Sequence, residues 1–261
     1  MSVPVFLSST YSYFMRQGVT DVQTIMDDFA TKAAAKGWTN PGAGLYKTPV
    51  DADGRWLDVL LTRITQQKLE WRVRDQSGNT IRTRRLCIAT GTSVATHIFV
   101  GEYHAHISVD WGIGWEYVHA GILDQTPETQ ASNSRYVFGN GTRTNTDTAD
   151  SYSAWTYAAM MDNATAYLGN RATQYSGNSS YYLGWTTNGN RIIRPWGMWT
   201  KVSGDSTNPR FHGRAYQCVI LPNDIAMGAK VTLPIDAGLS GLFMVCGIPA
   251  WTTARIAIRI G

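Results

Sequence analysis

Residues 101–111 (GEYHAHISVDW) alternate strictly between polar and apolar side chains. Successive side chains of a β-strand point to opposite faces, so this alternation predicts a strand with one polar and one apolar face. The polar face holds Glu102, His104, His106, Ser108 and Asp110. Such a strand is half-buried, and we expect its polar face to meet a loop or another subunit.

The two histidines on this polar face suggest a metal site as one alternative. Neutral imidazoles at positions i and i+2 of a strand can bind a metal ion, with Glu102, Asp110 or His119 as a further ligand. Acid–base catalysis by the same face is a second alternative. Because a His-x-His pattern alone is a weak metal motif, we expect no bound metal or other cofactor. His104, His106 and Asp110 are kept only as candidate metal ligands.

Residues 20–38 carry the one clear helical pattern of the chain. Apolar side chains recur there with a helical period, which predicts an amphipathic helix that packs on a sheet. These side chains are Val22, Ile25, Met26, Phe29, Ala30 and Ala33. Thr20 and Gln23 match a capping box, and Gly37 is expected to end the helix.

Most of the remaining apolar residues occur in short segments that are typical of β-strands. Before residue 125 these segments are 55–64, 68–75, 80–88, 94–100 and 114–123, and the last is expected to pair with residues 101–111. After residue 190 they are 191–202, 213–222, 229–235, 241–248 and 253–260. The sequence therefore predicts a mostly β (α+β) fold. We expect an antiparallel β-sandwich or barrel-like sheets, with one N-terminal amphipathic helix and long loops rich in Gly, Asn, Ser and Tyr.

Composition divides the chain into three parts. Residues 1–124 are expected to form the helix and a β-meander, and residues 125–190 a loop-rich insertion. Residues 191–261 supply strands that complete the same β core, so that the whole chain can form a single domain.

Aromatic residues in and after the insertion are candidate ligand or interface residues. They are Tyr175, Tyr181, Tyr182, Trp185, Trp196 and Trp199. Aromatic side chains in a Gly- and Asn-rich context can stack on a glycan. The same residue types are also typical of a loop core or of a protein–protein interface, and we favour these interpretations.

The C-terminal segment 253–260 alternates as well, with Ile256, Ile258 and Ile260 on one face and Arg255 on the other. A strand at the end of a chain leaves an adhesive edge unless it pairs within the fold or with a neighbouring chain. We therefore expect this segment to be integral to the fold or to an assembly. Arg255 and Ile258 are candidate interface residues.

Composition and motifs also bear on the class of protein. Charged residues make up 16% of the chain and the net charge is +4, which does not by itself indicate a nucleic-acid partner. The three cysteines form no Cys-x-x-Cys pair, so neither a zinc site nor a disulfide framework is expected. The sequence has no nucleophile elbow, metalloprotease motif or phosphate-binding glycine loop, and we expect no enzyme. Without a signal-peptide pattern or a long apolar run, it is expected to be made and used in solution, with no membrane contact.

Three stretches, residues 95–123, 205–223 and 241–261, resemble a family of virion structural proteins of tailed bacteriophages in local pattern and in order. Residues 44–64, which follow the helix, are similar to the opening of such proteins. The resemblance implies a non-enzymatic subunit of the phage particle, of the tail or baseplate, made in the host cytoplasm and not secreted. Its implied partners are other phage structural proteins and further copies of itself.

Low charge, abundant Tyr and Trp and adhesive strand ends agree with a protein whose surface is largely interface. Two alternatives remain open. One is a head decoration protein, or a carbohydrate- or receptor-binding module of the particle that uses the loops of residues 125–190 to bind a glycan. The other is a hydrolase whose site has no recognised motif.

Overall fold

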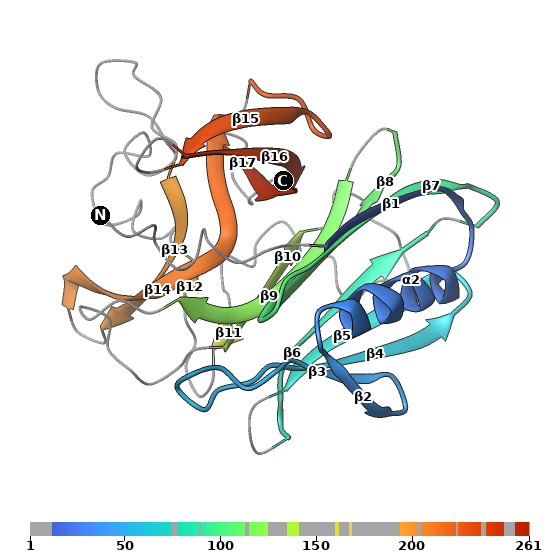
Figure 1. The fold of residues 1–261 in the computed structure, drawn as a ribbon, viewed down its shortest axis with the longest axis horizontal. Coiled ribbons are helices and arrows are strands. Elements are labelled where there is room, and N and C mark those ends of the chain that lie inside the picture. The colour runs from blue at the N-terminus through green and yellow to red at the C-terminus, as the bar shows by residue number, and fades with distance from the viewer. Residues whose placement is uncertain are drawn as a thin grey trace.

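A computed structural model describes residues 12–74, 78–88, 90–112, 115–124, 135–140, 160–161, 167–168, 194–202, 205–222, 224–235, 239–247 and 254–260. These residues form two antiparallel sheets and one α-helix (Figure 1). The mostly β fold with antiparallel sheets and an N-terminal helix, which the sequence predicts, is confirmed. No helix in the described part of the chain is long and apolar enough to cross a membrane. Most of the predicted loop-rich insertion, residues 125–190, lies outside the described residues.

The two sheets differ in size. The smaller sheet has five strands in the order β2 (Thr39–Gly42), β3 (Leu45–Lys47), β4 (Asp58–Thr65), β5 (Lys68–Arg74) and β6 (Thr80–Cys87). The large sheet has twelve strands, and its main path runs β1 (Ser12–Val19), β7 (Val94–Val100), β8 (His104–Asp110), β9 (Trp115–Asp124), β14 (Asp205–Pro222), β17 (Ala254–Arg259), β16 (Leu239–Gly247) and β15 (Lys230–Ile235). Off this path lie β10 (Arg135–Asn140), β11 (Met160–Met161), β12 (Tyr167–Leu168) and β13 (Arg194–Val202).

Strands β7, β8 and β9 form the middle of three β layers. Ile107 and Val118 on one face of this layer share a buried apolar cluster with Leu61 and Trp71 of the smaller sheet. The opposite face is covered by β14, β16 and β17, which belong to the same large sheet and curl back over it. In Figure 1 the orange and red C-terminal strands lie on one side of the green strands, and the cyan strands lie on the other. The middle layer therefore has a covering layer on each face.

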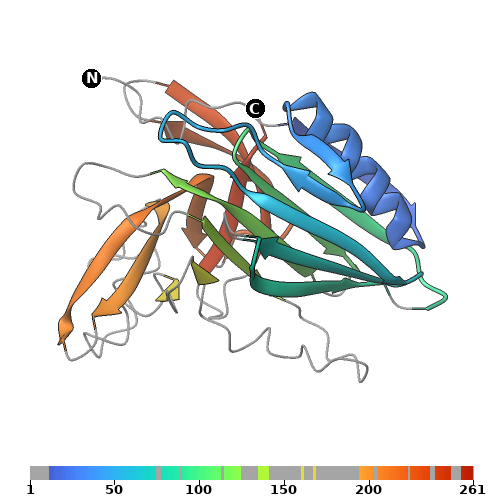
Figure 2. The same cartoon turned by 90° about the horizontal axis from the view of Figure 1, so that it is seen from below.

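Helix α2 (Val22–Ala35) lies against β1 and β7 of the large sheet and against β2 and β4 of the smaller sheet. Strands β1 and β2 are end strands of their sheets, so the helix packs along one edge of each sheet and connects the two edges, as Figure 2 shows. Phe29 is fully buried, and its ring meets those of Trp38, Tyr46 and Trp71 edge-on at centroid distances of 5.8, 5.1 and 5.5 Å. This aromatic cluster anchors the helix in the core between the sheets.

The predicted apolar stripe of the helix is confirmed, but its predicted cap is not. The buried members of the stripe are Val22, Ile25, Phe29 and Ala33, and Met26 and Ala30 pack against the same core. The N-cap is Asp21 rather than Thr20, because an Asp21 carboxylate oxygen accepts a hydrogen bond from the backbone N–H of Gln23 at 2.8 Å. A carboxylate in this position satisfies a helix N–H and also complements the positive end of the helix dipole.

The C-terminal strand β17 lies inside the sheet, between β14 and β16. Ile258 is in register with Cys218 of β14 on one side and with Met244 of β16 on the other. The segment was expected to pair either within the fold or with a neighbouring chain. It pairs within the fold along both of its edges.

Candidate functional site

The polar face of β8 lies inside the molecule. His104, His106 and Ser108 are 1%, 0% and 0% exposed. His97 of β7 and His119 of β9 lie on the same face, because they are in register with Ser108 and His106. The prediction that this face meets a loop or another subunit is wrong, and so is the prediction of a half-buried strand, because β14, β16 and β17 of the same chain cover it.

These four histidines, His97, His104, His106 and His119, are called the histidine layer below. The ring centroid of His119 lies 6.1 Å from that of His104 and 5.5 Å from that of His106. The His106 ring also stacks on Tyr117 at 5.4 Å and meets Phe99 edge-on at 5.4 Å. The imidazoles thus pack as flat aromatic groups between the two layers.

A short chain of hydrogen bonds links the histidine layer to the covering strands. The Ser108 hydroxyl donates to the carbonyl oxygen of Cys246 at 3.1 Å and is also hydrogen-bonded to His106 Nε2. Because the single serine proton goes to the carbonyl, His106 must donate from Nε2. Neutral His106 therefore carries its proton on Nε2, and its Nδ1 accepts no hydrogen bond from the described residues.

Burial keeps the whole layer uncharged at neutral pH. It lowers the pKa of His119 to about 3 and that of His97 to about 4, although Asp110 raises the His97 pKa in part. Burial and neighbouring imidazoles lower the pKa values of His104 and His106 well below the ordinary value for histidine. A charged imidazole would lose its water on burial, and the nearby Asp110 offsets this loss only in part at His97, so protonation is unfavourable in the folded state.

Of the predicted further ligands, His119 lies beside His104 and His106, whereas Glu102 and Asp110 are engaged elsewhere. Among the described residues, no three His, Cys, Asp or Glu side chains are arranged to hold a metal ion. Asp110 lies at the end of β8, where a carboxylate oxygen accepts from the N–H of Gly112 at 2.8 Å. Glu102, the other predicted carboxylate ligand, accepts from the Tyr103 hydroxyl at 2.9 Å in an exposed position. His104 and His106 thus share His119 as a ring neighbour, and neither predicted carboxylate joins them in the described part of the chain.

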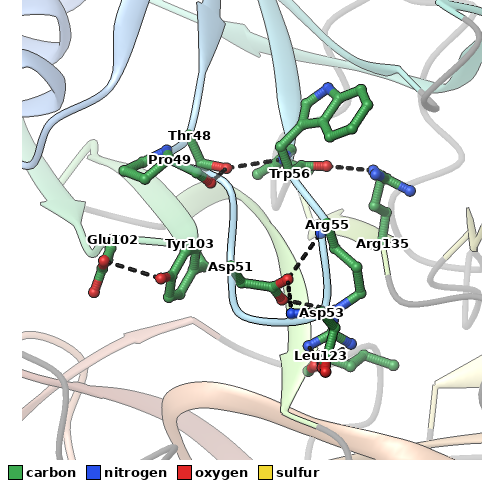
Figure 3. A network of polar contacts seen from close by, with 11 residues as sticks. Thr48, Pro49, Asp51, Asp53, Arg55, Trp56, Glu102, Tyr103, Leu123 and Arg135 are labelled. Atoms are coloured by element: carbon green, nitrogen blue, oxygen red, sulfur yellow. Dashed lines mark hydrogen bonds and ion pairs between the residues drawn. The ribbon is translucent and has the colours of Figure 1, made fainter.

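A polar loop between β3 and β4 forms a second candidate region, which the sequence reasoning missed (Figure 3). One Asp51 carboxylate oxygen accepts from the N–H groups of Asp53 and Arg55 at 3.0 and 2.8 Å, and the other accepts from Arg55 Nε at 2.7 Å. The Arg55 guanidinium also pairs with Asp53 at 3.1 Å and donates to the carbonyl oxygen of Leu123 on β9 at 3.4 Å. The Asp-x-Asp-Gly pattern at residues 51–54 could have predicted this loop from the sequence, because such patterns favour tight turns.

The same loop makes a second contact with the large sheet. Arg135 at the start of β10 donates from Nε to the Trp56 carbonyl oxygen, and its guanidinium lies over the Trp56 ring at 5.6 Å from the centroid. Loop residues 48–57 therefore tie the smaller sheet to β9 and β10. Arg55 pairs with both carboxylates of this loop, Asp51 and Asp53, which gives the loop a structural role in the described part of the chain.

The predicted interface residues fall into three groups. Tyr175, Tyr181, Tyr182 and Trp185 lie outside the described residues. Trp196 and Trp199 are in β13, and Trp199 is in register with Tyr167 and Phe211, but only the backbone of β13 is described.

Arg255 and Ile258 form the third group. Ile258 is fully buried, so its assignment as an interface residue is corrected: it belongs to the core between β14 and β16. Arg255 is partly buried, and this burial lowers the pKa of its guanidinium.

The described residues define a three-layered antiparallel β protein with a buried, neutral histidine layer. No protein-family model matches the chain, and no curated protein sequence matches it.

Proposed function

We propose that this chain is a non-enzymatic structural subunit of a tailed-bacteriophage particle, of the tail or baseplate, which assembles through protein–protein contacts. One support is the resemblance of residues 95–123, 205–223 and 241–261 to virion proteins of that kind. The structural observation that supports the proposal is strand β1, which among the described residues is paired along one edge only.

The end strands of the two sheets differ in how well they resist pairing with another chain. Strand β15 contains Lys230 and Pro234, and the short strand β2 contains Pro41, features that discourage strand addition at an edge. Strand β1 contains neither Lys nor Pro, and in the described residues it pairs with β7 alone. Its exposed Met15 adds an apolar side chain beside the free edge. Strand β6, the other end of the smaller sheet, also lacks Lys and Pro, but it carries Arg82, Arg84 and Arg85. Strand β1 has one charged residue, Arg16, and a register irregularity confined to residues 16–19, so we take β1 as the edge better suited to accept a strand from a neighbouring subunit.

Immunogold labelling of intact particles tests the proposal. Antibodies raised against the purified chain should label the tail or baseplate of phage particles that carry this sequence. Label on the head surface would favour the decoration alternative. Absence of the protein from washed particles would overturn the proposal.

A pair of Met15 variants tests the role of β1. Met15→Lys places a charge at the edge, and the folded variant should enter particles at reduced occupancy because edge lysines oppose strand pairing. Met15→Leu keeps the apolar side chain and should enter normally. Equal occupancy of both variants would exclude β1 as the contact while leaving the subunit assignment to the labelling experiment.

A further inference from the structure

The smaller sheet has one face turned toward α2 and the large sheet, and one face turned away from them. In β5 the inward side chains are Leu69, Trp71 and Val73, all fully buried. The alternate residues of β5 and their register partners therefore point outward. On this outward face the described charged side chains are Lys47, Asp58, Lys68, Glu70, Arg72, Arg74 and Arg85. We call it the basic face.

The two carboxylates of the basic face are buried at its base. Asp58 is in register with Lys47 on β3 and with Arg74 on β5, and it pairs with Lys47 Nζ at 3.6 Å. Glu70 on β5 is paired with two arginines: Arg85 at 2.9 Å and Arg72. Each carboxylate is therefore already neutralised by cations of the same face.

Exposure separates the two signs of charge. The side chains of Lys47 and Arg72 are 39% and 40% exposed, whereas those of Asp58 and Glu70 are 6% and 3% exposed. Long cationic side chains extend their head groups toward water while shorter acidic groups stay below them. A partner approaching this face meets ammonium and guanidinium groups first.

The number of cations favours a protein partner over nucleic acid. Five basic and two acidic side chains give the described part of this face a net charge of +3, compared with +4 for the whole chain. Proteins that hold a duplex commonly neutralise about 6–10 phosphates. The row of Leu45, Leu60 and Arg72 also places two half-buried leucines among the cations. Arginine beside apolar side chains is typical of protein–protein interfaces.

We propose that the basic face docks an acidic surface of a partner protein, whose carboxylates pair with the exposed head groups around Arg72. Glu70 holds Arg72 and Arg85 in place before the partner arrives, which lowers the entropy lost on binding. The inference rests on the proposed function, because it names one surface through which the subunit binds its neighbours.

Binding to poly-L-glutamate, an acidic polypeptide without sequence information, provides the test. The triple variant Lys47→Gln/Lys68→Gln/Arg72→Gln removes three cations from the basic face and leaves Arg85 on Glu70. The matched control is Lys32→Gln/Lys36→Gln/Lys230→Gln, which removes two half-buried lysines and one exposed lysine elsewhere. Thermal unfolding shows whether each variant is folded, and Lys68→Glu alone replaces the triple variant if the latter unfolds.

We expect the basic-face variant to lose about tenfold or more in affinity for poly-L-glutamate at low salt, and the control to lose about twofold or less. Equal losses in both variants would show a general charge effect and overturn the proposal. Tighter, face-dependent binding of a DNA duplex than of poly-L-glutamate would also overturn it, in favour of nucleic acid. Face-dependent binding of poly-L-glutamate by a protein that is absent from phage particles would retain the docking surface and reject the phage assignment.

Discussion

Ser108 of β8 donates a hydrogen bond to the carbonyl oxygen of Cys246 of β16 at 3.1 Å, across 138 positions of sequence. This contact joins the middle layer to the strands that cover its polar face. A buried serine beside neutral histidines is stable here because its hydroxyl and the His106 Nε2–H both have partners.

The histidine layer predicts that stability falls in acid. The pKa values of His97 and His119 are lowered in the folded state, so the unfolded chain binds more protons below about pH 6.5. The free energy of unfolding should therefore decrease as the pH falls from about 6.5 toward 4. His97 alone should lower the free energy of unfolding by about 2 to 3 kcal/mol at about pH 4.5 relative to neutral pH.

Urea unfolding at about pH 7.5, 6, 5 and 4.5 measures this dependence. These pH values cover most of the interval between the ordinary pKa of histidine and the lowered pKa values of the folded state. His97→Gln cannot titrate, and its stability should depend less steeply on pH than that of the wild type. Equal free energies of unfolding at the ends of this pH range would contradict the burial of neutral imidazoles.

Gly101→Ala should destabilise the β7–β8 turn. A Cβ at this position would lie 2.1 Å from His104 Cε1, in a buried ring that stacks on His119. We expect a loss of about 1–3 kcal/mol in urea unfolding, as for other overpacked sites. His104→Ala in the same chain should recover part of this loss, and a strictly additive double variant would show that the ring is not the obstacle.

Phe29→Ala should cost about 3–5 kcal/mol, because it removes a fully buried ring that contacts three other aromatic rings. Met26→Ala, at a partly buried position of the same helix, should cost less. Urea unfolding measures both. A loss of less than about 1 kcal/mol for Phe29→Ala would mean that the helix contributes little to the core.

Asp51→Ala should loosen the loop of residues 48–57, because it removes the acceptor for two backbone N–H groups and for Arg55 Nε. Loss of this partly buried network should cost about 1–3 kcal/mol and increase hydrogen exchange in the loop. Asp53→Ala, which removes a 70% exposed carboxylate, should cost less than about 1 kcal/mol. Similar exchange in the two variants would refute the anchoring role of Asp51.

Ile258→Asp should yield insoluble protein, because it buries a charge between β14 and β16. Leu242→Asp places the same charge at a 37% exposed position of β16 and should remain soluble. Deletion of residues 255–261 should act like Ile258→Asp, since β17 is paired on both edges. Soluble, cooperatively unfolding Ile258→Asp protein would show that β17 is dispensable for the fold.

Local patterns in the sequence were sufficient for the helix and for most of the longer strands, but they did not predict β1, β2, β3 or β10. The alternation of residues 101–111 predicts β8, and the spacing of Val22, Ile25 and Phe29 predicts α2, because both patterns depend only on the period of the backbone. The N-cap was missed because Thr20 and Asp21 are both suitable capping residues. The choice between them depends on where the chain leaves β1.

The environment of the polar face was decided by tertiary structure. Alternation shows that the two faces of β8 differ, but it does not show whether the polar face meets water or protein. The strands that cover His104, His106 and Ser108 come from residues 205–259, and Ile258 is in the core because β17 is inserted between β14 and β16. Such burial depends on contacts between residues far apart in the chain, and no local pattern specifies which strand will lie on which face.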